Sequence, residues 1–91
     1  MHQTYKILKL TMRNDKTLMA LIAWLRSRSY NTRVTKVRVA RIRTGCARSR
    51  LIDAFRTLET LGFGHLVLGR RGQETRFVWS VSTIELAARL K

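Results

Sequence analysis

Residues 35–63, TKVRVARIRTGCARSRLIDAFRTLETLGF, decide the fold of this chain. They predict two helices, at about 36–43 and 47–60, joined by a tight turn at residues 44–46. Four apolar residues of the second helix recur at i, i+3, i+4 and i+7 and therefore share one face: Leu51, Ala54, Phe55 and Leu58. Gly62 is expected to end this helix as its C-cap, with Phe63 packing back over the last turn. Two short helices around a glycine-containing turn are the pattern of a helix-turn-helix.

The segment 47–63, ARSRLIDAFRTLETLGF, resembles the recognition helix of winged helix-turn-helix DNA-binding domains. In that superfamily the helix opens with small or polar residues and closes in Leu-Glu-x-Leu-Gly and an aromatic or aliphatic residue, here residues 58–63. Val39-Ala40 matches the apolar-Ala pair of the preceding helix, and a basic hairpin follows where the wing should be. The resemblance covers about residues 14–82. It implies an α+β fold with a three-helix core, a basic β-hairpin wing and a short C-terminal helix.

The chain carries 19 Lys and Arg residues against 5 Asp and Glu, a formal net charge of +14 over 91 residues. This length predicts one domain with a modest core, and 45% hydrophobic residues are enough for folding. The charge predicts a polyanionic partner, which would relieve the repulsion between the cations. Fourteen of the 19 cations are arginine, which binds phosphates and guanine edges bidentately, so nucleic acid is the expected partner.

Other functional classes lack the residues that they need. The single cysteine, Cys46, excludes an intramolecular disulfide and is expected to fill the tight turn, and no Cys/His set has zinc-ligand spacing. No apolar stretch reaches the ~18 residues of a membrane span, and the N-terminus lacks the pattern of a signal peptide. No catalytic triad, paired-carboxylate motif or phosphate-binding glycine loop is present. We therefore expect a cytoplasmic protein, or one of the host cytoplasm if viral, associated with the nucleoid when bound. We expect no enzyme activity, cofactor or small-molecule substrate.

The N-terminal third of the chain predicts an ambiguous segment and then a helix. Residues 1–13 mix the periodicities of strand and helix, and we expect an arm or strand, on the domain's own core or at a dimer interface. A helix begins at Asn14 or Asp15, either of which can be its N-cap. Its core stripe comprises Leu18, Leu21, Ile22 and Leu25. A short strand at 32–35 follows, and Thr35 is the expected N-cap of the next helix.

After Gly62 the apolar period changes to two, which predicts a β-hairpin with one face toward the core. That face would comprise Leu66, Leu68, Phe77, Trp79 and Val81, with residues 69–74, GRRGQE, as a polar loop. Residues 82–85, STIE, form a capping box. The winged helix-turn-helix domain at 14–82 is thus followed by a C-terminal helix at 83–91.

The basic balance is concentrated on the helix-turn-helix, because residues 26–56 contain ten cations and a single acid, Asp53. The candidate base contacts lie on or beside the face opposite the core stripe: Ser49, Arg50, Asp53 and Arg56. Arg50 and Arg56 suit the O6 and N7 atoms of guanine. Asp53 could accept from a cytosine amino group, but we favour an intrahelical pair that orients Arg50 or Arg56. A merely solvated face would normally mix charge signs.

The remaining candidates would contact the DNA backbone or form the wing. Candidate backbone contacts are Lys36, Arg38, Arg41, Arg43, Thr44, Arg48 and Thr57. Thr44 and Arg48 lie near the start of the second helix, where free N–H groups favour a phosphate, and some of the other cations could simply face solvent. Candidate wing residues are Arg70, Arg71 and Gln73, which suit the minor groove or its phosphates. The alternative for them is a hairpin tip that is basic for solubility.

These patterns predict a sequence-specific protein of double-stranded DNA, a transcriptional regulator that represses by occluding a promoter. Its helix 47–60 would enter the major groove and its wing 69–74 would lie on the minor groove or backbone. The apolar terminal segments suggest a homodimer. The alternatives are a non-specific architectural or RNA-binding protein, a replication or recombination accessory protein, and a protein–protein adaptor. Alanine at Arg50 separates the first two classes, because only sequence-specific binding loses affinity selectively.

Overall fold

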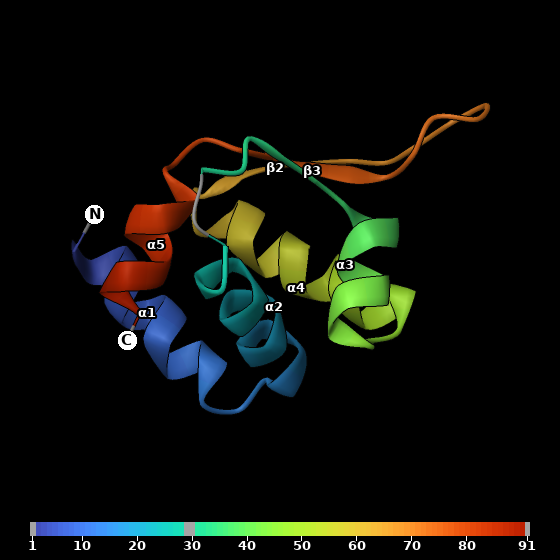
Figure 1. Cartoon of the computed structure of the whole chain (residues 1–91). Coiled ribbons are helices and arrows are strands. Elements are labelled where there is room, and N and C mark those ends of the chain that lie inside the picture. Colours follow the sequence, from blue (N-terminus) through green and yellow to red (C-terminus); the bar gives the residue numbers. More distant parts are fainter. Residues whose placement is uncertain (1, 29–30, 91) are drawn as a thin grey trace.

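The computed structural model describes residues 2–28 and 31–90. Their elements are α1 (His2–Met12), α2 (Lys16–Arg26), β1 (Val34–Lys36), α3 (Val37–Thr44), α4 (Arg48–Thr60), β2 (Gly64–Val67), β3 (Arg76–Trp79) and α5 (Thr83–Arg89). The three strands form one antiparallel sheet in the order β1-β3-β2. Figure 1 shows the helices on one side of this sheet, and the β2–β3 loop projecting past α3, away from α1 and α5. The fold of the described residues is therefore α+β.

The predicted core stripes of α2 and α4 are confirmed. Asp15 is the N-cap of α2, and its side chain accepts a hydrogen bond from the Leu18 amide at 3.0 Å. The eight apolar residues of the two stripes are at most 3% exposed: Leu18, Leu21, Ile22, Leu25, Leu51, Ala54, Phe55 and Leu58. Phe77 and Trp79 of β3 close this core from the sheet side. Burial of these side chains supplies most of the driving force for folding.

Residues 2–12 form a helix, α1, and the expected arm or strand is wrong. Leu8 is fully buried, while Tyr5 and Met12, three residues before and four after it, pack against the same core. Ile7 and Leu10 remain about half exposed. The buried residues thus follow helical spacing. Burial of these residues against α2 selects the helical periodicity over the strand periodicity. The sequence alone contains both patterns, so the choice depends on tertiary packing.

α3 and α4 are the two helices that the sequence predicts, and each begins one residue later than expected. α3 ends at Thr44, and its C-cap is Gly45, whose φ of 73° is left-handed and whose amide donates to the Arg41 carbonyl at 2.9 Å. Glycine adopts this conformation without the strain that a side chain would add. The exposed turn then leads directly into α4, which begins after Ala47 without a side-chain cap.

The closing motif of α4, LETLGF, ties the helix to both the sheet and the core. Gly62, at a φ of 87°, follows the C-cap, and its amide donates to the Glu59 carbonyl at 3.0 Å. The Phe63 amide donates to the Leu58 carbonyl at 3.0 Å, which completes a Schellman motif. The Glu59 carboxylate accepts from the Leu66 amide of β2 at 2.9 Å. The prediction that Gly62 ends the helix and Phe63 packs back is confirmed, with Gly62 one position beyond the cap itself.

Thr35 does not cap α3, so that prediction is wrong. The residue before α3 is Lys36, which makes no side-chain capping bond. Thr35 instead lies in β1, opposite Phe77 of β3, and its hydroxyl accepts from the Trp79 indole N–H at 2.8 Å. A buried indole N–H needs a partner, and the β1–β3 pairing makes Thr35 that partner.

The hairpin is confirmed, with one change at its outer end. β2 pairs with β3 from Gly64 opposite Trp79 to Val67 opposite Arg76. A Cβ atom at Gly64 would lie 2.5 Å from the Phe77 ring, so glycine is needed for the close packing of this pair. Leu68 lies beyond β2 and is 51% exposed, so its predicted place on the apolar face is wrong. The backbone has already turned into the loop there, which ends the alternation.

Helix α5 packs on α2 and belongs to the same core. Its predicted cap is confirmed, because the Ser82 hydroxyl accepts from the Glu85 amide at 3.2 Å. Leu86 and Leu90 are buried, whereas Ile84 is 45% exposed. None of the described helices has the length and apolar character that crossing a membrane requires.

Candidate nucleic-acid interface

The predicted base-contacting residues form the exposed outer face of α4. This exposed set comprises Ser49, Arg50, Asp53 and Arg56. Among the described residues no ion pair joins Asp53 to Arg50 or Arg56, so the expected intrahelical pair of Asp53 is not formed in this structure. An exposed pair of this kind gains little free energy in water, so nothing holds these side chains together. The carboxylate of Asp53 therefore faces solvent beside two arginines.

One side of this face borders a hollow of about 440 Å³ at the start of α2. Arg50 and Asp53 line it from α4, and residues 14–17 line it from the N-terminal end of α2. Lys16 thus joins the surface, although it is not among the predicted contacts. Its lone position in the sequence gave no signal, because only the packing of α2 on α4 places it beside Arg50.

A cleft of about 310 Å³ lies between α3, the first residue of α4 and the β2–β3 loop, which is the predicted wing. The residues that line it are Val37, Arg38, Arg41, Arg48, Gly69, Gln73, Glu74 and Thr75. Three predicted backbone contacts, Arg38, Arg41 and Arg48, and one predicted wing residue, Gln73, therefore share one cleft. Ser49, Arg43, Arg56, Thr57, Arg70 and Arg71 line neither this cleft nor the hollow beside α2.

Thr75 fixes the base of the wing to both helices of the helix-turn-helix. Its carbonyl accepts from the Val37 amide of α3 at 3.0 Å. Its buried hydroxyl accepts from the Arg48 guanidinium at 3.2 Å and from the Gly69 amide at 3.0 Å. The wing and the first turn of α4 are thereby held in a set relation. Thr75 is not among the predicted site residues, because a threonine in a polar loop carries no sequence pattern of its own.

The tip of the wing is a tight turn over residues 70–73. The Gln73 amide donates to the Arg70 carbonyl at 3.0 Å, and the two central residues, Arg71 and Gly72, have φ values of 49° and 87°. Positive φ at both central positions defines a type I′ turn, which matches the twist of a hairpin. Arg71 is the one non-glycine residue with positive φ in the described chain. Arg70, Arg71 and Gln73 are all exposed, as predicted.

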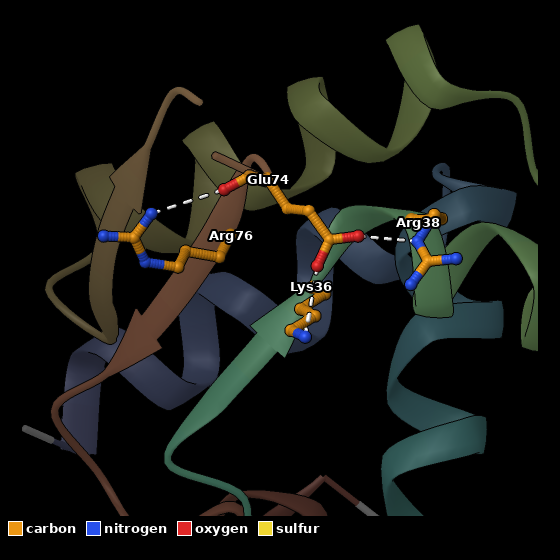
Figure 2. A network of polar contacts seen from close by, with 4 residues as sticks. All are labelled: Lys36, Arg38, Glu74 and Arg76. Carbon is orange, nitrogen blue, oxygen red and sulfur yellow. Dashed lines mark hydrogen bonds and ion pairs between the residues drawn. The ribbon is translucent and has the colours of Figure 1, made fainter. Parts of the chain in front are cut away.

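Glu74 is the centre of a polar network at the wing base, which Figure 2 shows. Its carboxylate lies 3.1 Å from the Lys36 ammonium and 2.6 Å from Nε of Arg38, and its carbonyl accepts from the Arg76 guanidinium at 3.3 Å. The hydrogen bonds from Lys36 and then Arg38 hold the pKa of the Glu74 carboxyl below its ordinary value, so it is ionised at neutral pH. Two of the predicted backbone contacts are therefore paired with an acid in the free protein.

Comparisons of the chain with protein-family models, with curated proteins and with solved structures found no match. The function of this surface is therefore inferred from its own charges, contacts and shape.

Two predicted backbone contacts already use their hydroxyl protons within the fold. The Thr44 hydroxyl donates to the Ala40 carbonyl at 2.7 Å and accepts from the Cys46 amide at 3.2 Å. The Thr57 hydroxyl donates to the Asp53 carbonyl at 3.2 Å. A phosphate oxygen can only accept, so either hydroxyl would have to break its bond to contact one. We therefore assign Thr44 to the turn and Thr57 to the helix.

Most of the acidic residues are committed to contacts within the fold. Four of the five acids serve the fold: Asp15 caps α2, Glu59 binds β2, Glu74 binds the wing base, and Glu85 pairs with Arg89 at 3.1 Å. Within the described chain, no ion pair reaches the cations that surround α4 and the wing tip: Arg41, Arg43, Arg48, Arg50, Arg56, Arg70 and Arg71. These seven arginines are therefore without an ion-pair partner in the described structure.

Proposed function

We propose that this chain is a winged helix-turn-helix protein that binds double-stranded DNA in a sequence-specific manner. The observation that carries the proposal is the position of α4, whose N-terminal half lines two depressions that contain arginine: Arg48 lines one, and Arg50 and Asp53 line the other. α4 would enter the major groove, and the wing would lie on the minor groove or the backbone. A regulator that represses by occluding a promoter is the role that fits such binding.

The order of the elements supports the fold assignment. α2, β1, α3, α4, β2 and β3 follow one another in the chain, and β3 lies between β1 and β2 in the sheet. A winged helix-turn-helix has this order, with α4 as the recognition helix and the β2–β3 loop as the wing. The wing base is bonded through Thr75 to α3 and α4, so both reading elements would approach one duplex together.

The shape of the surface fits a duplex better than a single strand. A major groove about 12 Å wide admits one helix, and the phosphates of the two strands then lie on both sides of it. Arg38, Arg41 and Arg48 would meet one strand in the cleft beside the wing. Lys16 and Arg50 lie at the hollow on the opposite side. Phosphate contacts on both sides would fix the register of α4 in the groove.

Within the groove, the outer face of α4 would supply base contacts. Arg50 and Arg56 suit guanine, and Ser49 suits a base or a nearby phosphate. Asp53 has a free carboxylate in the described structure, so a cytosine amino group becomes its preferred partner. At the wing tip, Arg70 and Arg71 suit a narrow minor groove, whose negative potential attracts arginine.

We also propose a homodimer, but fewer apolar residues of the terminal segments are available for its interface than the sequence indicates. Leu8, Leu86 and Leu90 are buried in the chain's own core, which leaves Ile7, Leu10 and Ile84 as exposed apolar residues of the terminal helices. Those helices lie at the end remote from the wing loop, so a dimer through them would leave α4 accessible (Figure 1). Light scattering that shows only monomers at micromolar concentration, with and without DNA, would exclude this dimer.

The proposal is tested by selection of the full chain on a random duplex library at about 150 mM salt, near physiological ionic strength. We expect an enriched motif. Arg50→Ala should then lose roughly 1–3 kcal/mol on that motif and little on random duplex. Lys9→Ala, which removes a charge from the exposed side of α1, is the control. Salt-sensitive binding without enrichment would instead indicate an architectural or RNA-binding protein.

A further inference from the structure

Glu74 places a carboxylate where the proposed interface needs a phosphate. It lines the cleft between α3 and the wing, and it pairs with Lys36 and Arg38, both expected to contact the DNA backbone. We propose that Glu74 occupies a phosphate-binding position in the free protein, and that a phosphodiester of the bound duplex displaces it from Lys36 and Arg38. This inference rests on the proposed function. It adds that the Glu74 carboxylate competes with the DNA phosphates for Lys36 and Arg38.

The geometry of the pair supports exchange with a phosphate. Two cationic groups from the β1–α3 junction converge on one carboxylate, at 3.1 and 2.6 Å, as they would on two oxygens of a phosphodiester. The exposed fractions of these side chains are 52% for Lys36, 69% for Arg38 and 33% for Glu74. Exposed ion pairs are weak, so an incoming anion can replace the carboxylate without opening the core.

The other cations of the cleft attract a phosphate. Arg41 and Arg48 line the same cleft and have no acidic partner among the described residues. The cleft therefore keeps a positive charge even though Glu74 pairs with Lys36 and Arg38. Thr75, next to Glu74, is held by α3 and α4. Because the backbone at Thr75 is fixed, the Glu74 side chain can swing away while the wing keeps its position.

The experiment compares Glu74→Gln with Glu85→Gln. Both substitutions raise the net charge by one and break an exposed ion pair, but Glu85 pairs with Arg89 on α5, outside the interface. We expect Glu74→Gln to bind a random-sequence duplex about two- to tenfold more tightly than Glu85→Gln, because DNA no longer has to break the Glu74 contacts. Equal affinities would overturn the proposal, since only net charge would then matter. Weaker binding by Glu74→Gln would also overturn it, because Glu74 would then position the two cations for DNA.

The salt dependence distinguishes displacement from simple blocking. If DNA displaces Glu74, the wild type and Glu74→Gln make the same phosphate contacts, and their plots of log K against log salt concentration should be parallel. If Glu74 keeps its cations in the complex, Glu74→Gln gains up to two contacts and its slope steepens by roughly 0.9 for each. A steeper slope would therefore refute displacement.

Two further measurements complete the test. The gain from Glu74→Gln should vanish in a background of Lys36→Gln and Arg38→Gln, and a gain that persists there would refute the role of these cations. Inorganic phosphate, added at constant ionic strength, should weaken duplex binding by Glu74→Gln only slightly, because a single anion competes at Lys36 and Arg38 alone while the duplex makes many other phosphate contacts. Strong competition by phosphate would instead assign the cleft to a free anion. Absence of duplex binding by the wild type would contradict the proposed function itself, and thermal melting of both variants checks their folding.

Discussion

Arg71 should show opposite effects on stability and on DNA binding. It lies at the tip of the wing with a φ of 49°, in a turn whose other central residue is Gly72. A left-handed conformation costs a residue with a side chain roughly 1–2 kcal/mol. Asparagine tolerates this conformation far better, and Asn-Gly is the preferred pair of a type I′ turn. Arg71→Asn therefore relieves the turn and removes one charge from the wing.

The size of each effect follows from this conformation. Relief of part of the left-handed cost should raise the free energy of unfolding by about 0.5–1 kcal/mol. For a chain of 91 residues, 1 kcal/mol corresponds to roughly 4–8 °C in Tm. If Arg71 contacts one phosphate, its loss should also reduce the slope of log K against log salt concentration by about 0.9. The variant would thus be more stable and bind DNA more weakly.

Thermal melting and salt-dependent fluorescence anisotropy measure the two effects, and two variants serve as controls. Arg70→Asn removes the same charge from a residue with ordinary φ, so it should weaken DNA binding without raising Tm. Lys9→Gln removes a charge from α1 and should change neither quantity greatly. A Tm for Arg71→Asn no higher than that for Arg70→Asn would refute the strained turn. A salt slope equal to that of Lys9→Gln would refute contact between the wing tip and DNA.

Three further predictions concern the fold that holds the interface. Thr35→Val leaves the buried indole N–H of Trp79 without its partner, and urea unfolding should show a loss of about 1–3 kcal/mol. Gly64→Ala forces a methyl group against the Phe77 ring and should cost roughly 1–3 kcal/mol or more in the same assay, whereas no loss would show that the sheet adjusts freely. Burial, and secondarily a nearby glutamate, raise the pKa of the Tyr5 hydroxyl, so the folded state binds its proton more tightly. Stability should therefore fall as pH rises above about 10, and Tyr5→Phe should reduce that fall.

The parts of the fold that the sequence predicts are those set by local patterns. The stripes of α2 and α4, the Asp15 cap and the turn at Gly62 each follow from residues within one or two helical turns of each other. The missed features are non-local. The pairing of β1 with β3 places the Thr35 hydroxyl where it accepts from the Trp79 indole N–H. The same pairing places Glu74 within ion-pair distance of Lys36. No spacing in the sequence encodes those contacts, because their partners lie about 40 residues apart.

The same division applies to the candidate interface. Exposure of the α4 face follows from the helical period, so the candidate base contacts could be chosen from sequence alone. Which cations remain uncompensated depends on where the few acids lie, and that is set by tertiary structure. Glu74 pairs with Lys36 and Arg38, whereas Asp53, which lies three residues from both Arg50 and Arg56 on α4, pairs with neither arginine. The acid on the outer face of α4 is thus without an ion-pair partner in the described structure, whereas the acid at the base of the β2–β3 loop has two. For that reason we expect Asp53 to contribute to the choice of sequence and Glu74 to the strength of backbone binding.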